Sequence, residues 1–474
     1  MPSPSSVLRL CAHLILSAPL WAIAPSIAQP VNWTWGTFER PYAATSPWNS
    51  RPIDPVLGTA VIPTRWYFPT VTAGAYSTQA FRAQTSDGSM EVHAYPGSAG
   101  ISIPDTYGYV PTVTIPRWPA NTQPATGTDG HAEIIDEQTG KIHSFFGLKQ
   151  VEGLWQAKLY AWSPLQGRGW ADPAYFHQGA RSSGVSTIAG LIRAHEVNDG
   201  DTMYRHALAM SMDYTGLSRK PTYVFPATTA DYQAEYTNSG PFPLGTLMML
   251  PPSFNEQAIP NPDLRKVALT LKTYGAYAVE RNFGTPYVIF AEIGSPKIVH
   301  KTGWTNRDAD DLQRIRAALR AVVSTSGWLD GNGLPYQRST EGLNILSIGR
   351  NWVRTRGPDN ASFDIMSRQL VFKADPVPTT MVMSGTSMLS KVTWAQPAAG
   401  QTFLFSANTT GGATIRISLI ACTGYRNADS GTLSGTQVAT LVWPEKLCSV
   451  RLMATGATNR ESSVAPTLTA YGPP

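Results

Sequence analysis

The chain has 474 residues, which is long enough for more than one domain of about 150 residues. Only 15% of the residues are charged, and the 14 Trp, 19 Tyr, 40 Gly and 38 Pro favour a turn-rich β protein over a helical bundle or a disordered chain. The 37 Lys and Arg against 32 Asp and Glu give a net charge of +5, without the Lys/Arg runs of a nucleic-acid binder.

The first 28 residues have the pattern of a secretory signal peptide. Arg9 precedes an apolar run, 10–24, that is too short to span a bilayer, and Ser26 and Ala28 form a cleavage site of small residues. An N-terminal anchor that is never removed is the alternative. We expect a mature protein that begins near Gln29, is secreted or periplasmic, and has no membrane contact after cleavage.

Residues 29–60 are rich in Pro and Trp and are expected to form an extended N-terminal arm. A β-rich main domain is expected over 61–374, where short β-type runs are separated by Gly, Pro and Asp. The segment 136–140 ends in Gly and predicts a hairpin turn between two of these runs. The predicted strands in this first part are Val92–Tyr95, Val110–Ile115, Ala132–Ile135 and Ile142–Phe146.

Three helices are expected in the main domain. Apolar residues at helical spacing predict one over 184–197. The clearest helix has Asn261 as its N-cap, Pro262 at its first position and an end near Gly275. A third is expected over 308–323, with Asp in its first turn. Strands are predicted at Tyr204–Met212, Ala276–Glu280 and Tyr287–Ala291.

A linker at 375–378 precedes a segment, 379–474, of Thr, Ser, Gly, Ala and Val that predicts a small β-sandwich. Cys422 and Cys448 lie in this module and are expected to pair, with two buried thiols as the alternative. The fold class is therefore mainly β: a sandwich- or jelly-roll-like main domain with a few short helices, and a C-terminal all-β sandwich module. The strands predicted in the module are Thr402–Ser406, Thr414–Ala421 and Val438–Trp443.

A Gly-rich segment, 127–136, carries the most suggestive polar residues. It brings His131 to the start of a predicted strand, where His131 and Glu133 share one face because side chains alternate along a strand. A carboxylate beside an imidazole shifts the pKa of the His and suits acid–base catalysis. The alternative is a surface strand with both side chains in solvent.

Two further strands carry polar residues. His206 shares a predicted strand face with Tyr204, although a buried core residue would have the same pattern. Glu280 and Asn282 end another strand, where catalytic carboxylates often stand and where a solvated turn is the alternative. Neither His131 nor His206 has the spacing to a second His that a zinc site requires, so no metal and no cofactor is predicted.

Six short motifs occur in an order that resembles a widespread family of secreted bacterial proteins, most of them carried as hypothetical and with no settled activity. The resemblance covers about residues 40–300. In the family pattern a His stands where this chain has Thr229, which weakens a three-His metal site, and an Asp stands at Glu280, which keeps a carboxylate there. The motifs are SPWN (46–49), GTDGHAEIID (127–136), GLIRAHEV (190–197), RHAL (205–208), YVFPA (223–227) and LKTYG (271–275).

Export, a β-rich body and many Trp and Tyr for stacking on sugars predict a secreted carbohydrate-active enzyme. It would cleave an extracellular or cell-wall polysaccharide, or an oligosaccharide derived from it. A glycoside hydrolase needs two carboxylates about 5–10 Å apart, whereas a lyase needs a base and a cation that neutralises a uronate. The hydrolase is favoured because that class is commoner, and a non-catalytic carbohydrate-binding or cell-surface protein is the alternative.

The chain has neither the G-x-S-x-G nor the H-E-x-x-H motif, which argues against a protease. No nucleic-acid partner is expected, and the sequence leaves the oligomeric state open. The candidate catalytic residues are His131, Glu133, His206 and Glu280, and the candidate substrate-binding residues are Asp129, Arg181, Tyr204 and Asn282.

Overall fold

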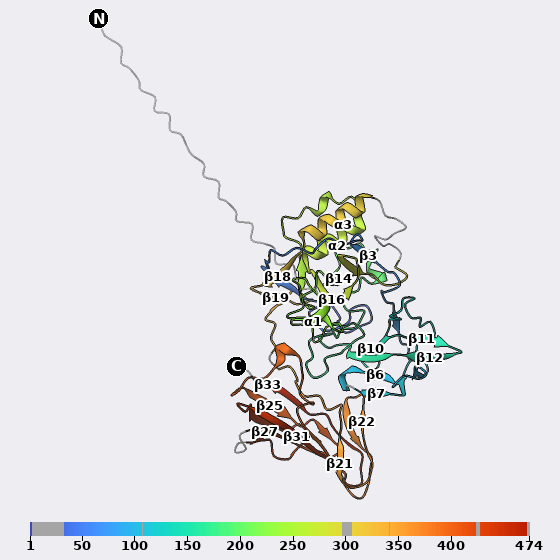
Figure 1. Ribbon diagram of the computed structural model, residues 1–474, viewed down its shortest axis with the longest axis vertical. Helices are drawn as coiled ribbons and strands as arrows, with labels where there is room; N and C mark the ends of the chain where they lie inside the picture. Colours follow the sequence, from blue (N-terminus) through green and yellow to red (C-terminus); the bar gives the residue numbers. More distant parts are fainter. Residues whose placement is uncertain (2–32, 107, 296–305, 341, 423–426, 472–474) are drawn as a thin grey trace.

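The computed structural model describes residue 1 and residues 33–106, 108–295, 306–340, 342–422 and 427–471. Apart from Met1, the expected signal peptide lies outside the described residues, and so does the start of the expected arm. Within them, many strands in several sheets accompany three α-helices (Figure 1), which confirms the mainly β fold class. No helix in the described ranges is long and apolar enough to cross a membrane.

A seven-stranded mixed sheet lies at the centre of the main domain. Its inner strand β14 is buried along its whole length, as expected for a strand covered on both faces. β14 and β16 are parallel, with Ser211 opposite Glu280, so their carboxyl ends meet at one edge. In spatial order the strands are β2 (Val56–Leu57), β18 (Arg320–Ser324), β15 (Leu247–Met249), β16 (Ala276–Asn282), β14 (Leu208–Asp213), β17 (Tyr287–Phe290) and β3 (Thr70–Thr72).

α2 (Pro262–Thr273) confirms the helix that the sequence marks most clearly. Asn261 Oδ1 accepts hydrogen bonds from the N–H groups of Asp263 (3.0 Å) and Leu264 (3.3 Å), as an N-cap does. α2 and α3 (Asn306–Ala318) lie at one end of the molecule, beside the central sheet (Figure 1), and the third helix, α1 (Ala234–Thr237), is a single turn.

The helix expected over 184–197 is wrong. The segment forms turns, with only the 3-10 turn η2 (Ala194–Glu196) near its end. Gly190 has a φ of +68°, its carbonyl accepts from Ala209 N, and a Cβ there would lie 2.5 Å from the Trp48 ring. Its apolar residues are therefore buried by turns that pack against β14, which produces the same burial without a helix.

Two other boundaries differ from the sequence prediction. α3 ends at Ala318 and the chain continues as β18, because the β-branched Val322 pairs with Leu57 in the central sheet. The strand expected from Tyr204 begins only at Leu208, so His206 lies in the turn region before it.

Two smaller sheets lie beside the central one. The hairpin expected at 136–140 is confirmed, since β9 and β10 are antiparallel and Asp136 faces Lys141. One sheet has the order β4 (Ala80–Arg82), β9 (Ala132–Asp136), β10 (Lys141–Phe146), β13 (Leu159–Pro164), β6 (Ile101–Ile103), β7 (Gly108–Val110), and the other β11 (Lys149–Val151), β12 (Leu154–Ala157), β5 (Met90–Ala94), β8 (Thr112–Ile115).

The C-terminal part is all β, and it includes the Cys422–Cys448 disulfide expected from the sequence. β21 and β23 precede the linker expected at 375–378, yet they pair with strands that follow it. The sheets of this module therefore begin before residue 379. Their strands are β21 (Val353–Arg356), β24 (Thr380–Ser384), β31 (Leu447–Thr455), β27 (Thr414–Ala421), β28 (Asn427–Asp429) and β29 (Leu433–Ser434); β22 (Ala361–Asp364), β23 (Gln369–Phe372), β32 (Ser462–Val464) and β26 (Thr409–Thr410); and β30 (Val438–Val442), β25 (Thr402–Ser406) and β33 (Thr467–Ala470).

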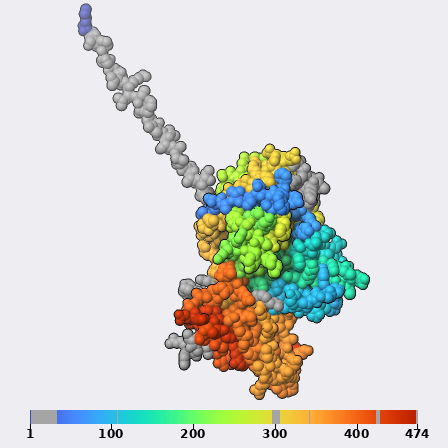
Figure 2. All heavy atoms as spheres, in the orientation of Figure 1, coloured from blue at the N-terminus to red at the C-terminus, as the bar shows by residue number. Residues whose placement is uncertain are grey.

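The module contacts the main domain through Arg368. Its guanidinium pairs with the buried Asp105 at 2.9 Å and lies over the rings of Trp162 (3.8 Å) and Tyr175 (4.0 Å). Trp162 Nε1 in turn donates to the carbonyl of Ile365 at 2.8 Å. Figure 2 shows the module (orange to red) in contact with the rest of the molecule.

A further small sheet joins distant segments: β1 (Arg51–Ile53), β19 (Gly327–Leu329) and β20 (Pro335–Tyr336).

Candidate active site

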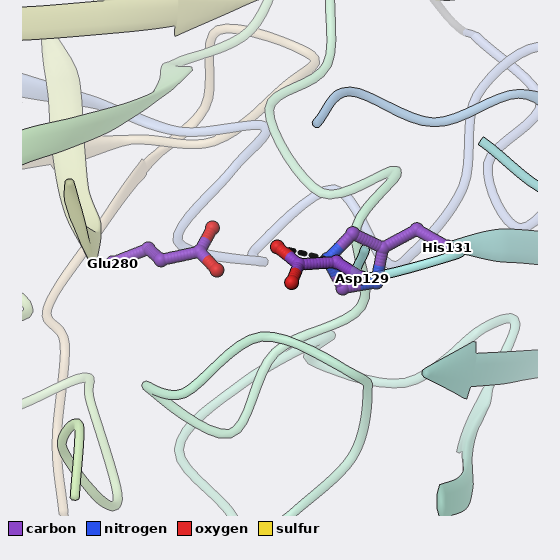
Figure 3. A group of neighbouring side chains, drawn as sticks. All are labelled: Asp129, His131 and Glu280. Carbon is purple, nitrogen blue, oxygen red and sulfur yellow. Dashed lines mark ion pairs between the residues drawn. The ribbon is translucent and has the colours of Figure 1, made fainter. Parts of the chain in front are cut away.

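Two carboxyl groups and an imidazole meet where the carboxyl end of β16 faces the turn before β9. Asp129 and His131 come from that turn and Glu280 from β16, and one polar atom of each lies within 4.8 Å of the others. Figure 3 shows the carboxyl groups of Glu280 and Asp129 pointing toward each other, with the imidazole of His131 beside Asp129. The geometry therefore joins segments about 150 residues apart in sequence.

Glycines shape the turn that carries Asp129. A Cβ at Gly127 would lie 2.5 Å from the carbonyl oxygen of Ala75, so only Gly fits there. Gly130 has a φ of +48°, and a Cβ there would lie 2.8 Å from the carbonyl of Leu148. The carbonyl of Asp129 accepts from the N–H of Gly147 at 2.6 Å, which fixes the turn against the end of β10.

Arg181 supplies the positive charge of the site. Its side chain is fully buried, its Nη1 donates to Glu280 Oε2, and its guanidinium lies 3.9 Å from the centre of the Phe290 ring. Within the described residues, Nε and Nη2 of Arg181 have no hydrogen-bond partner. The guanidinium therefore holds Glu280 in place and keeps two donors free.

Burial, helped by the carboxyl groups of Asp231 and Asp129, raises the pKa of Glu280 to about 7 against the opposing charge of Arg181. Burial also raises the pKa of Asp129, although its side chain is 30% exposed and Arg181 opposes the shift. Near pH 7 the pair thus favours a shared proton, held mainly on Glu280.

His131 is the most enclosed member of the group. It is 1% exposed, and its Nε2 lies 3.8 Å from Asp129 Oδ2. Burial and then the charge of Arg181 lower its pKa to about 3, so the imidazole is neutral at physiological pH. The alternative considered from the sequence, a surface strand with His131 in solvent, is therefore wrong. His131 is instead a buried, neutral ring beside Asp129.

Asp129, His131 and Glu280 have the composition of a divalent-cation site, since carboxylate oxygen and imidazole nitrogen are common ligands. The presence of Arg181 argues against a cation, because its guanidinium already pairs with Glu280. The charge of Arg181 also lowers the pKa of Asp129 and of His131. A second positive charge at this place would be repelled by the buried guanidinium.

We therefore expect that dialysis against a chelator leaves any catalytic rate of the protein unchanged within about twofold, because Arg181 supplies the charge that a metal would supply. Activity of the native protein is measured before and after dialysis, and again after addition of Ca²⁺, Mg²⁺ or Zn²⁺. Loss of activity that one of these ions restores would show that the site holds a metal.

Glu133 lies apart from this group in its hydrogen bonding. Its side chain is fully buried, and it accepts hydrogen bonds from Ser144 Oγ (2.5 Å), Ser186 Oγ (2.8 Å), and the N–H and Oγ1 of Thr187 (2.8 and 2.7 Å). Four donors occupy the lone pairs of the Glu133 carboxylate, so the arrangement does not match the catalytic role expected from the sequence. Because the side chain is buried, it does not match the solvated strand either. Glu133 ties β9 to β10 and to the turn at 186–187.

His206 lies at a second place, where it lines a small pocket of about 40 Å³ under the N-terminal segment. His206 Nε2 lies 3.1 Å from Glu196 Oε2. Burial lowers the pKa of His206, but Glu196 outweighs it, so the pKa lies above its ordinary value. Tyr204 is 4% exposed, and its ring lies 6.3 Å from that of His206. The structure thus separates His206 from the group of Asp129, His131 and Glu280.

Asn282 is near the site without pointing at it. Its Nδ2 donates to Ser211 Oγ at 3.0 Å, and its Oδ1 accepts from the N–H of Thr285.

Two functional neighbours were missed by sequence reasoning. Asp231 acts on Glu280 through its charge, and Glu196 pairs with His206. Asp231 stands in an irregular loop with no periodic signal, whereas Glu196 is part of the GLIRAHEV motif that was quoted without assigning it a role.

Comparisons with known proteins add the following. No family model and no curated protein matches the sequence. Among solved structures, one match is the glycosylation-associated Gap123 complex of Streptococcus agalactiae (10% identity, TM-score 0.19, 25% of this chain and 44% of that one). A second is the enzymatically active domain of tailspike protein 4 of bacteriophage CBA120 (9%, TM-score 0.18, 26% of this chain and 19% of that one). A third is the module TmCBM61 with β-1,4-galactotriose (8%, TM-score 0.18, 26% of this chain and 88% of that one). The chain thus spans less than half of the first two, and TM-scores this low support no functional inference.

Proposed function

We propose that the protein is a secreted carbohydrate-active enzyme, a glycoside hydrolase that cleaves an extracellular or cell-wall polysaccharide. The observation that carries the proposal is the facing pair of carboxyl groups of Glu280 and Asp129, whose polar atoms lie within 4.8 Å. Carboxyl groups about 5–5.5 Å apart are typical of glycosidases that retain the anomeric configuration. The cysteine pair agrees with an oxidising compartment.

The two carboxyl groups take different roles because their surroundings differ. Glu280, with a pKa of about 7, carries the proton and donates it to the oxygen of the departing sugar. Asp129, the more exposed of the two, attacks the anomeric carbon and forms a glycosyl ester. Glu280 is then a carboxylate and takes a proton from water, and that water cleaves the ester. Both groups return to their starting states.

Arg181 and His131 are positioning residues in this scheme. The buried guanidinium stabilises Glu280 once it has lost its proton. The neutral ring of His131 borders the nucleophile without adding a charge that would compete for it. The free donors of Arg181 also suit the carboxylate of a uronate, which is the observation that favours a lyase as the second candidate.

Release of reducing ends from a polysaccharide panel tests the proposal. We expect cleavage without unsaturated ends, and proton NMR should show that the first product keeps the anomeric configuration of the bond cleaved. Ultraviolet absorbance from unsaturated ends would support the lyase instead. Binding without cleavage of any polymer would support the non-catalytic carbohydrate-binding or cell-surface protein.

The pH profile gives a second test. Because Glu280 must be protonated to act as the acid, kcat/KM is expected to fall tenfold per pH unit above about pH 7. At low pH, kcat/KM falls as Asp129 becomes protonated, because Asp129 must be ionised to attack. The pKa read from this acid limb should be higher than that of an ordinary Asp, because burial raises the pKa of Asp129. A profile that stays flat from pH 6 to 9 would contradict the role of Glu280.

A further inference from the structure

A lysine lies beside the turn that carries Asp129. Lys158, between β12 and β13, is exposed, and its stem packs on Gly147, where a Cβ would lie 2.8 Å from Lys158 Cγ. The N–H of Gly147 donates to the carbonyl of Asp129 at 2.6 Å. Burial raises the pKa of Asp129, and the charges of Arg181 and Lys158 oppose that shift. Lys158 therefore stands close to the proposed nucleophile and packs on the residue that fixes its turn.

The ring of Tyr95 orders this lysine together with a second one. The ammonium of Lys149 lies 3.9 Å from the centre of the ring, and that of Lys158 lies 5.6 Å from it. The two charges are therefore within about 10 Å of each other, the distance over which moderate salt screens a charge. Tyr95 Oη donates to the carbonyl of Gly147 at 2.6 Å, so the ring is bonded to the same residue that holds the turn of Asp129.

Within the described residues, neither lysine has a carboxylate as an ion-pair partner. A cation of the neighbouring sheet does, since Arg117 pairs with Asp136 at 3.0 Å. Lysines on an edge strand such as β11 prevent pairing with other chains, which would account for Lys149. It does not account for Lys158, because β12 and β13 both lie inside their sheets.

A third positive charge lies in the site itself. In the resting state of the proposed mechanism Glu280 carries a proton, because burial raises its pKa to about 7, so it does not cancel the charge of Arg181. Asp231 opposes this charge, although burial raises the pKa of Asp231 as well. The charges of Arg181 and Lys158 both act on Asp129, and both attract a negatively charged group on a ligand bound there.

We propose that Lys158, together with Lys149, binds the acid group of an acidic polysaccharide at a sugar close to the bond that is cleaved. This inference rests on the proposed function, because the chain bound here is the substrate of Glu280 and Asp129. It adds the class of substrate, which the two carboxyl groups alone do not determine. An ammonium is a point charge, so the acid group is the carboxylate of a uronate or a sulfate ester.

The test is binding by the full-length protein that carries Glu280→Gln, so that polymers are bound but not cut. Isothermal titration calorimetry at fixed ionic strength compares polygalacturonate, alginate and carrageenan, each with its own uncharged form made by carboxyl reduction or desulfation. These treatments keep the chain and its linkages and remove the charge. We expect at least one acidic polymer to bind about tenfold more tightly than its uncharged form, and the polymer that does so distinguishes carboxylate from sulfate.

Adding Lys149→Gln and Lys158→Gln should raise the Kd for that acidic polymer about tenfold and leave the Kd for its uncharged form unchanged. The matched control, Lys373→Gln with Lys446→Gln, removes the same charge from two exposed lysines of the C-terminal module. Its Kd should equal that of the parent.

Equal Kd values for the two double variants, equal binding of the acidic and uncharged forms, or no binding of an acidic polymer would each overturn the inference. Failure of the proposed function is a separate result. In that case the acidic polymer is bound through Lys158, but the otherwise native protein leaves it uncut or releases unsaturated ends.

Discussion

Glu280→Gln is expected to lower kcat/KM on the polysaccharide by about 10²–10⁴-fold, the usual contribution of a general acid. The amide keeps the shape of the side chain and its contact with Arg181 but has no proton to donate to the leaving oxygen. Turnover of an activated aryl glycoside should be restored by azide, which attacks the glycosyl ester without needing a base. The glycosyl azide should keep the anomeric configuration of the substrate, and proton NMR identifies it.

The matched control is Glu256→Gln. Glu256 also pairs with a cation, Lys272 at 2.7 Å, and its side chain is 14% exposed against 18% for Glu280. It lies in the 3-10 turn η3 (Glu256–Ala258), which precedes α2. The substitution should leave the rate unchanged. If Glu280→Gln cleaves the polymer as well as Glu256→Gln does, the assignment of Glu280 as the acid fails.

Glu133→Ala is expected to lower the free energy of unfolding by about 4 kcal/mol, the range reached when a buried hydrogen-bond network is broken. The substitution removes an acceptor that serves Ser144, Ser186 and both donors of Thr187, and it leaves those donors buried. Urea unfolding followed by Trp fluorescence measures the change.

Glu133→Gln separates a structural from a catalytic role. The amide keeps the volume, and the two Ser hydroxyls can rotate to accept from it, so its cost in stability should be smaller. Glu137→Ala, on the partly exposed residue after β9, is the control for removing a carboxylate in the same hairpin and should change stability by less than about 1 kcal/mol. A Glu133→Gln protein that is as stable as the parent yet inactive would return Glu133 to the catalytic residues.

Local signals predicted the elements that local forces determine. The cap at Asn261, followed by Pro262, identifies α2, because the side chain bonds to the helix that it starts. The apolar residues of 184–197 misled the helix prediction, since Gly190 allows the same residues to be buried by turns. The end of α3 was missed because Val322 finds its partner, Leu57, far away in the sequence.

The candidate site shows the same division. The Gly-rich turn that carries Asp129 and His131 was identified from the sequence, and so was Glu280 at the end of its strand. Alternation along β9 suggested a pair of His131 and Glu133, but it does not reveal that hydroxyl groups about fifty residues away surround Glu133. His206 paired instead with Glu196, ten residues earlier, because the strand begins only after it.

Arg368 restricts how the two parts of the molecule work together. An accessory module on a flexible linker searches a volume and raises the local concentration of polymer around its enzyme. Here the guanidinium between Trp162 and Tyr175, paired with Asp105, fixes the module against the main domain. Its distance from Glu280 is then a constant of the molecule. Under the proposed function, a polysaccharide held by both parts would need a length and a curvature that match that span, whereas short oligosaccharides would not. Chain length would then be a variable on which cleavage selects.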